Sequence, residues 1–136
     1  MKSFVPLLLA LLVVPGCSTV STRKVMPLDG FRRIFVERRL NDNHHVDEEF
    51  VAALRRLGRE ASSGPLTMMP ENTDAVLTYD ARWEWEFKNY LIELNLEVHT
   101  AHTHKKLADA RYYQPSIVPK APADVIHDLL IQLFGK

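Results

Sequence analysis

Two segments carry apolar residues at the three- and four-residue spacing of an amphipathic helix. The first covers residues 46–57. Candidate N-cap residues precede it at 41–43, and Gly58 stands at the position where a helix commonly ends. The second covers 122–134 and begins with Pro122, a residue that suits the first helical position. The pattern therefore predicts two helices, each with one apolar stripe.

Four other segments have the composition or the two-residue period of β-strands: 31–38, 74–87, 90–100 and 107–113. The period is clearest over 92–98, where Ile, Leu and Val alternate with Glu and Asn. In the preceding strand, Trp83, Trp85 and Phe87 alternate with charged residues, so we expect these aromatic side chains to face the core. Tyr79 shares this face unless a bulge near Asp80 and Ala81 changes the register.

The order of these elements is β-α-β-β-β-α, which predicts an α+β fold in two layers. We expect a mixed four-stranded sheet with both helices on one face. The first two strands should be parallel, because a helix connects them, and the last three should form an antiparallel meander. Residues 30–136 would make this single domain, with residues 17–29 as a flexible tether before it.

The start of the chain has the layout of a secretory signal peptide. A basic start is followed by an apolar run over 4–14, about half the roughly 20 residues that a membrane-spanning helix needs. Gly16 then directly precedes Cys17, the one cysteine of the chain. These residues resemble the lipobox of bacterial lipoproteins, from which Pro15 departs. The alternative is an ordinary signal peptide followed by a free thiol.

The lipoprotein resemblance implies that residues 1–16 are cleaved and that Cys17 is lipidated, for example with palmitate, to become the first residue of the mature protein. It also implies that Ser18, in place of Asp, directs such a protein to the outer membrane, where it faces the periplasm. Removing one Lys from the 17 Lys and Arg residues leaves 16, against 17 Asp and Glu. The mature chain is therefore nearly neutral, which argues against a nucleic-acid partner and leaves the acyl chains as its membrane attachment.

The order of the elements, together with the lipobox, resembles the domain at the N-terminus of TolB and in auxiliary lipoproteins of ABC-type transport systems. The resemblance covers about residues 31–135 and carries no specific motif. It implies a non-enzymatic adaptor that binds another protein of the cell envelope. The sequence has no phosphate-binding loop, no cofactor motif and no nucleophile with a base at a meaningful spacing, so we expect no cofactor and no enzymatic activity.

Two groups of residues are candidates for binding. Leu66, Met68 and Met69 lie in a loop rich in Ser, Gly and Pro, and flexible methionines suit an adaptable protein-binding surface. His99, His102 and His104 lie at a strand end and turn, where imidazoles this close in sequence can bind Zn²⁺ or Cu²⁺. The spacing matches no specific zinc motif, and a solvated turn, where polar residues gather in any case, is the explanation that we favour. The alternative function is thus a periplasmic module that binds a small ligand or a metal.

Overall fold

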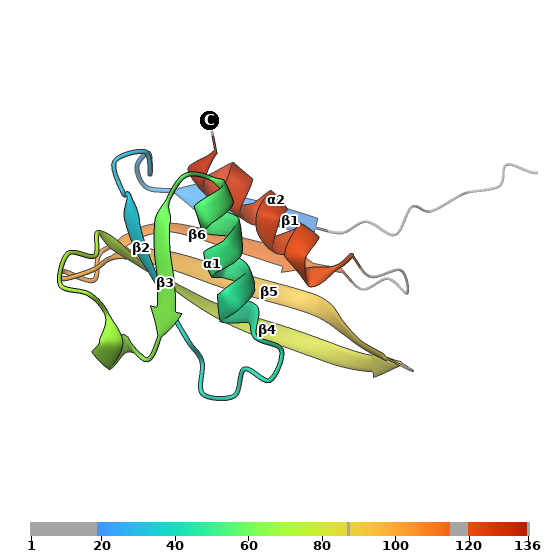
Figure 1. Ribbon diagram of the computed structural model, residues 1–136. Coiled ribbons are helices and arrows are strands. Elements are labelled where there is room, and N and C mark those ends of the chain that lie inside the picture. The colour runs from blue at the N-terminus through green and yellow to red at the C-terminus, as the bar shows by residue number, and fades with distance from the viewer. Residues whose placement is uncertain (1–18, 87, 115–119, 136) are drawn as a thin grey trace, which may run out of the picture.

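A computed structural model describes residues 19–86, 88–114 and 120–135 (Figure 1). The chain forms one mixed sheet with the strand order β1-β6-β5-β4-β2-β3, and two helices pack on it. The elements are β1 (Thr19–Lys24), β2 (Arg33–Glu37), α1 (Val46–Arg56), β3 (Glu60–Gly64), the short 3₁₀ helix η1 (Leu66–Met68), β4 (Ala75–Glu86), β5 (Lys88–Thr100), β6 (Lys106–Tyr113) and α2 (Pro122–Phe134).

The prediction of a four-stranded sheet is wrong, because the sheet has six strands. The two missed strands are β1 and β3, which lie at its two edges. β1 falls within the segment that the sequence predicts to be a tether, and it pairs antiparallel with β6. β3 pairs parallel with β2. Both strands consist mainly of small, polar or charged residues, so neither has the two-residue apolar period that marks a half-buried strand.

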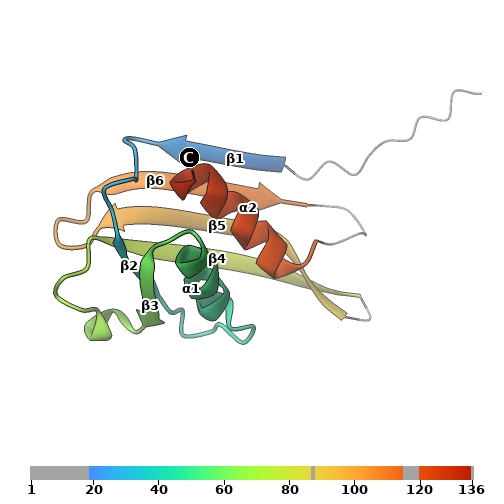
Figure 2. The same ribbon diagram turned by 45° about the horizontal axis from the view of Figure 1, so that its top comes forward.

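The other predicted strands and both helices are present. β2 is parallel to β4, and β4, β5 and β6 form the expected antiparallel meander. Both helices cover the same face of the sheet (Figures 1 and 2). The core between the layers contains Phe50 and Leu54 of α1, Ile126 and Leu130 of α2, and the inward residues of the strands. The α+β class and the placement of the helices therefore agree with the prediction.

The end of α1 follows the glycine signal in the sequence. Gly58 has a φ of 82°, a conformation that glycine adopts without a steric penalty. Its N–H donates to the carbonyl of Arg55, and the N–H of Arg59 donates to the carbonyl of Leu54, both at 3.0 Å. These two bonds satisfy carbonyls of the last helical turn and form a Schellman motif. The chain then enters β3 directly.

The aromatic residues at the end of β4 do not all face the core as predicted. Trp83 is partly buried against the core, but the side chain of Trp85 is 68% exposed. The register shifts between Arg82 and Trp83, just after the bulge predicted near Asp80 and Ala81. Phe87 lies outside the described residues. Trp85 is uncovered because the β4–β5 hairpin projects past the ends of both helices (Figure 2).

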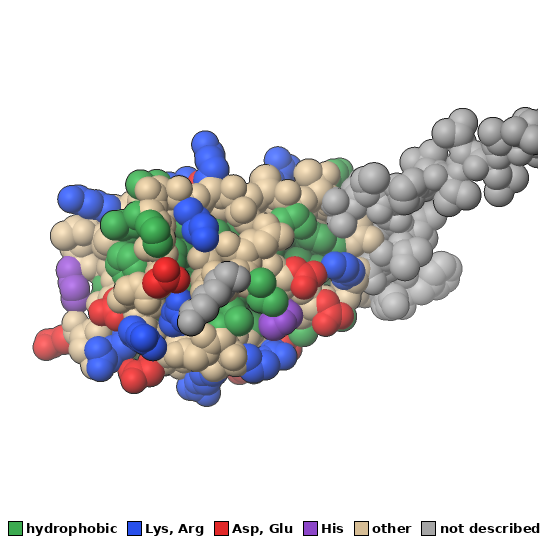
Figure 3. All heavy atoms as spheres, turned by 90° about the horizontal axis from the view of Figure 1, so that it is seen from above, with side chains coloured by type: hydrophobic (Ala, Val, Ile, Leu, Met, Phe, Trp, Pro, Cys, Tyr) green, Lys and Arg blue, Asp and Glu red, His purple; other side chains and the backbone are tan. Residues whose placement is uncertain are grey.

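The face of the sheet opposite the helices carries a ladder of opposite charges. Glu93 of β5 pairs with Arg82 of β4 at 3.0 Å and with Arg111 of β6 at 3.2 Å. Lys106 pairs with both Glu97 and Asp109. Charges of both signs are also interspersed on the face seen in Figure 3. These pairs are cross-strand contacts on a solvated sheet, each worth well under about 1 kcal/mol.

Candidate protein-interaction surface along β4

Most of β4 has a partner strand on one side only. The strand is twelve residues long, yet β2 pairs with it only from Ala75 to Leu77. No other strand of the described residues pairs with that side of β4 from Thr78 onward. Three hollows lie along this unpaired edge. They adjoin one another, since the middle hollow has Thr78 in common with one neighbour and Tyr79 in common with the other. We call the edge and these hollows the β4 edge surface.

The first hollow is an apolar groove of about 260 Å³ on the open face of the sheet. We call it the Leu66 groove; it is lined by Glu37, Leu66, Val76, Thr78, His99 and His104. The η1 segment contributes Leu66 to the wall of the groove. Gly64, just before it, lies close to both the Phe35 ring of β2 and Met68, since an atom at its missing Cβ would be 3.7 Å from the ring and 3.8 Å from the Met68 Cβ. The three loop residues predicted for protein binding differ in exposure: Leu66 is 40% exposed, Met68 is 70% exposed and Met69 is partly buried.

The structure separates the three candidate histidines. His99 and His104 line the Leu66 groove, and His99 Nε2 lies 3.4 Å from a carboxylate oxygen of Glu97. His102 instead lies with its Nε2 2.9 Å from the carbonyl oxygen of Glu71. Within the described residues, no group of three or more His, Cys, Asp or Glu side chains is placed to hold a metal ion. The two sequence-derived candidates thus meet at one groove, through two histidines and Leu66.

The second and third hollows lie between β4 and the turn that leads into α1. One, of about 400 Å³, includes Leu40, whose side chain is fully exposed. The other, of about 340 Å³, is lined by residues of that turn and by the β4 segment from Tyr79 to Trp83. There the imidazole of His44 stacks on the indole of Trp83, with ring centroids 3.8 Å apart. Sequence reasoning did not find Leu40; an isolated Leu between Arg39 and Asn41 in a polar turn was its only signal.

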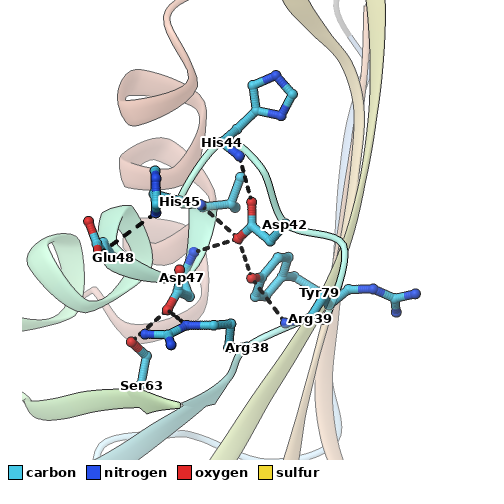
Figure 4. A network of polar contacts seen from close by, with 10 residues as sticks. Arg38, Arg39, Asp42, His44, His45, Asp47, Glu48, Ser63 and Tyr79 are labelled. Atoms are coloured by element: carbon cyan, nitrogen blue, oxygen red, sulfur yellow. Dashed lines mark hydrogen bonds and ion pairs between the residues drawn. The ribbon is translucent and has the colours of Figure 1, made fainter. Parts of the chain in front are cut away.

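Asp42 fixes the shape of this turn (Figure 4). One carboxylate oxygen accepts hydrogen bonds from the N–H groups of Val46, at 2.8 Å, and Asp47, at 3.2 Å, in the first turn of α1. The same oxygen accepts from the hydroxyl of Tyr79 on β4 at 2.5 Å. His45 adopts a φ of 55°, which bends the chain so that Asp42 reaches the helix. The N-cap position is His45, whose side chain makes no capping bond, and not one of the predicted residues 41–43. Asp42 nevertheless binds N–H groups of the first turn from outside the helix and ties the helix to the sheet.

Burial and the neighbouring Asp42 carboxylate raise the pKa of the Tyr79 hydroxyl above its ordinary value. Tyr79 therefore remains a hydrogen-bond donor at physiological pH. Its side chain is buried, and its ring lies 5.2 Å from that of Phe50, centroid to centroid, in the core. Tyr79 thus connects the β4 edge surface both to the turn and to the core.

We expect Asp42→Ala to lower the free energy of unfolding by about 2 kcal/mol, because it removes the acceptor both of first-turn N–H groups of α1 and of the Tyr79 hydroxyl. Urea denaturation at pH 7 measures this change. Asp42→Asn is the matched control, since its amide oxygen can still accept these hydrogen bonds, and it should cost less than half as much. Equal losses in the two variants would contradict the role given to the hydrogen bonds.

The predicted lipidation site, Cys17, lies outside the described residues and stays a prediction. The helices of the described residues are too short to cross a membrane. Neither observation changes the geometry of the β4 edge surface, which consists wholly of described residues.

Comparisons with known proteins show the fold. No family model and no curated protein sequence matches the chain. Among solved structures, the chain is similar to PelC from Paraburkholderia phytofirmans, described as a dodecamer in two crystal forms. A PelC variant gives a TM-score of 0.65 at 14% identity, over 86% of this chain and 97% of that one. PelC in the second crystal form gives 0.63 at 15% identity, over 88% and 99%.

A minor lipoprotein from Acinetobacter baumannii also matches, with a TM-score of 0.39 at 17% identity, over 75% of this chain and 87% of that one. The PelC structures establish a shared fold alone, because their identity to this chain is low. The resemblance to TolB and to auxiliary transport lipoproteins is not among these likenesses and stays an expectation. The chain has the fold seen in PelC.

Proposed function

We propose that this protein is a lipid-anchored, non-enzymatic adaptor of the bacterial cell envelope that binds protein along the β4 edge surface. Lipidation at Cys17 would hold it at the periplasmic side of the outer membrane. The observation that carries the binding role is the departure of β2 from β4 after Leu77, which leaves a long strand with an unpaired side. Such an edge accepts a further strand through main-chain hydrogen bonds, while side-chain pockets next to it provide specificity.

The other two strand edges are less suited to pairing. The outer edge of β3 is partly blocked, because the guanidinium of Arg55 donates to the carbonyl of Ala61 through Nε at 3.1 Å and Nη2 at 2.9 Å. β1 is short and ends in Arg23 and Lys24, and charged residues on an edge disfavour pairing. The β4 edge is flanked instead by exposed apolar side chains: Leu40 lines one of its hollows and Leu66 lines another.

The partner that we propose first is another copy of the chain. The two PelC structures, which share this fold, are described as dodecamers. This supports self-association of the present chain. The nearly equal numbers of acidic and basic residues favour the same choice, since two copies do not repel each other through a large net charge. We do not propose the metal-binding alternative, because the described residues provide no group of three ligands.

We expect Leu66→Asp to abolish self-association of the full-length protein in detergent. Burying Leu contributes about 1.5–3 kcal/mol at an interface, and burying an unpaired Asp costs more, so each contact should weaken more than about tenfold. Native mass spectrometry measures the oligomer. Val25→Asp is the matched control, because Val25 is 75% exposed and lies outside the β4 edge surface, and it should keep the wild-type oligomer.

A wild-type protein that stays monomeric would contradict self-association. Crosslinking in intact envelopes would then test for a different protein partner, again with the two Asp variants. An oligomer that forms equally well with Leu66→Asp would show that the copies meet elsewhere and would contradict the surface that we propose.

A further inference from the structure

The turn between β2 and α1 carries an isolated apolar side chain. The N–H of Asp42 donates to the carbonyl of Arg39 at 3.2 Å, which closes a turn with Leu40 and Asn41 at its two corners. Turn corners usually carry small or polar residues, yet Leu40 stands there fully exposed. The bonds from Asp42 to the start of α1 and to Tyr79 fix the position of the turn. Leu40 is therefore a preformed apolar knob on the β4 edge surface.

The Leu66 groove has room for one such side chain. Its volume is about 260 Å³, whereas the loss of one buried leucine side chain can leave a cavity of about 150 Å³. Leu66 and Val76 provide apolar surface in its lining. The Leu40 of the same copy does not fill the groove, because that residue is fully exposed. Each copy thus presents an apolar knob and, in an adjoining hollow, an apolar groove that can take it.

The charges beside the knob and the groove are opposite. Glu37 lines the groove, and no basic side chain in the described part of the chain forms an ion pair with it. Arg39, next to the knob, makes only a loose contact of 3.9 Å with the exposed Asp80. Its side chain points away from the network around Asp42 (Figure 4). A second copy can therefore bring its Arg39 to Glu37 as its Leu40 enters the groove.

From this complementarity we infer that Leu40 of one copy inserts into the Leu66 groove of a second copy, with its Arg39 beside the Glu37 of that second copy. The inference rests on the self-association proposed above and names the side chains that meet. Leu40 is the most exposed large apolar residue of the described chain. Because its turn is already fixed, burying it requires little further ordering, which favours binding.

Knob and groove belong to one surface, since Glu37 and Thr78 line both the hollow that contains Leu40 and the Leu66 groove. The same contact can therefore join two copies reciprocally or repeat from copy to copy. In both arrangements, one intact knob and one intact groove are enough to form one contact. This property allows the contact to be tested by mixing two variants.

Native mass spectrometry of the full-length protein in detergent makes this test. Leu40→Asp removes the knob and keeps the groove, whereas Leu66→Asp damages the groove and keeps the knob. We expect each variant alone to associate more than about tenfold more weakly than the wild type. Their mixture should form a one-to-one complex through the single intact pair. Val25→Asp is again the control, because it changes neither part and should keep the wild-type oligomer.

Charge reversal tests the pairing of Arg39 with Glu37. Glu37→Arg and Arg39→Glu should each weaken association about tenfold or more at low ionic strength, because like charges would then face each other across the contact. The double variant carries the opposite charges in exchanged positions and should regain most of the wild-type affinity. Circular dichroism of each variant verifies the fold, which Leu40→Asp should leave unchanged because Leu40 is fully exposed.

The outcomes separate this inference from the proposal on which it rests. An oligomer that is lost in Leu66→Asp but kept in Leu40→Asp would overturn the inference and leave the β4 edge surface in place. Two variants that both dissociate and do not combine on mixing would show that the knob and the groove do not meet. A double charge reversal that restores nothing would contradict the pairing of Arg39 with Glu37. A monomeric wild type would overturn self-association, and the inference with it.

Discussion

Replacing Arg38 by Met is expected to lower the free energy of unfolding by about 2–3 kcal/mol, a large part of the stability of an ordinary domain. Arg38 Nε lies 2.8 Å from a carboxylate oxygen of Asp47, and the Asp47 side chain is almost completely buried. Without the guanidinium, this carboxylate would keep the hydroxyl of Ser63, at 2.8 Å, but no positive partner. The loss should fall below the roughly 3–5 kcal/mol of a fully buried pair, because Arg38 itself is half-exposed.

Arg39→Met provides a control at the adjacent position. Arg39 is as exposed as Arg38, but it lies 3.9 Å from Asp80, whose side chain is 72% exposed, so its removal should change stability by less than about 0.5 kcal/mol. Urea denaturation of the two variants at pH 7 makes the comparison. Similar losses for both would show that the buried Asp47 carboxylate does not depend on its ion pair.

The same ion pair predicts how the stability difference depends on pH. Burial raises the pKa of Asp47, but hydrogen bonds from Arg38 and Ser63 outweigh it, so that the pKa lies below its ordinary value. The ionised carboxylate therefore stabilises the wild-type fold above the pKa of the unfolded chain, about 4, and this contribution is lost as the pH falls through the lower folded-state pKa. In Arg38→Met, only the hydrogen bonds from Ser63 and from the backbone of Glu48 would still oppose the effect of burial on the pKa of Asp47. The deficit of the variant should thus be largest near pH 7 and shrink as Asp47 is protonated.

The parts of the fold that the sequence predicts correctly are those with a local signal. α1, α2 and the strand β5 have clear apolar periods, and Gly58 and Pro122 mark helix ends by their own backbone preferences. β1 and β3 have no such signal. The polar sequence of β1 forms a strand because β6 lies beside it, and β3 forms one because the end of α1 returns the chain next to β2. Both strands therefore form through pairing with strands that are distant in the sequence.

The candidate surface was predictable to a similar degree. Leu66 and the histidine turn stand out in the sequence, but they meet at one groove only because the fold brings η1 beside the end of β5. Asp42 was recognisable as a candidate to bind the start of α1, whereas its bond to Tyr79, 37 residues later, follows from the position of β4 beside the turn. For Trp85, by contrast, a local signal in the sequence led to a wrong prediction. Its alternation with charged residues indicates a buried face, but the helices end before they reach it.

Cys17→Ser is expected to release most of the protein from the membrane fraction. Each acyl methylene buried in a bilayer contributes about 0.8 kcal/mol, so that loss of even two methylenes changes partitioning by about tenfold, and the serine variant would lose whole chains. Fractionation of cells followed by intact mass measurement tests both the release and the missing acyl mass. Ser18→Ala is the control, since it leaves the cysteine in place and should remain bound and acylated.

Two other outcomes would contradict the lipid anchor. A Cys17→Ser variant that stayed bound with an unchanged mass would show that Cys17 carries no acyl chain. A variant that lost the acyl mass but stayed bound would show that another part of the protein attaches it to the membrane. Release together with loss of the acyl mass would place the attachment at Cys17, two residues before the first strand begins.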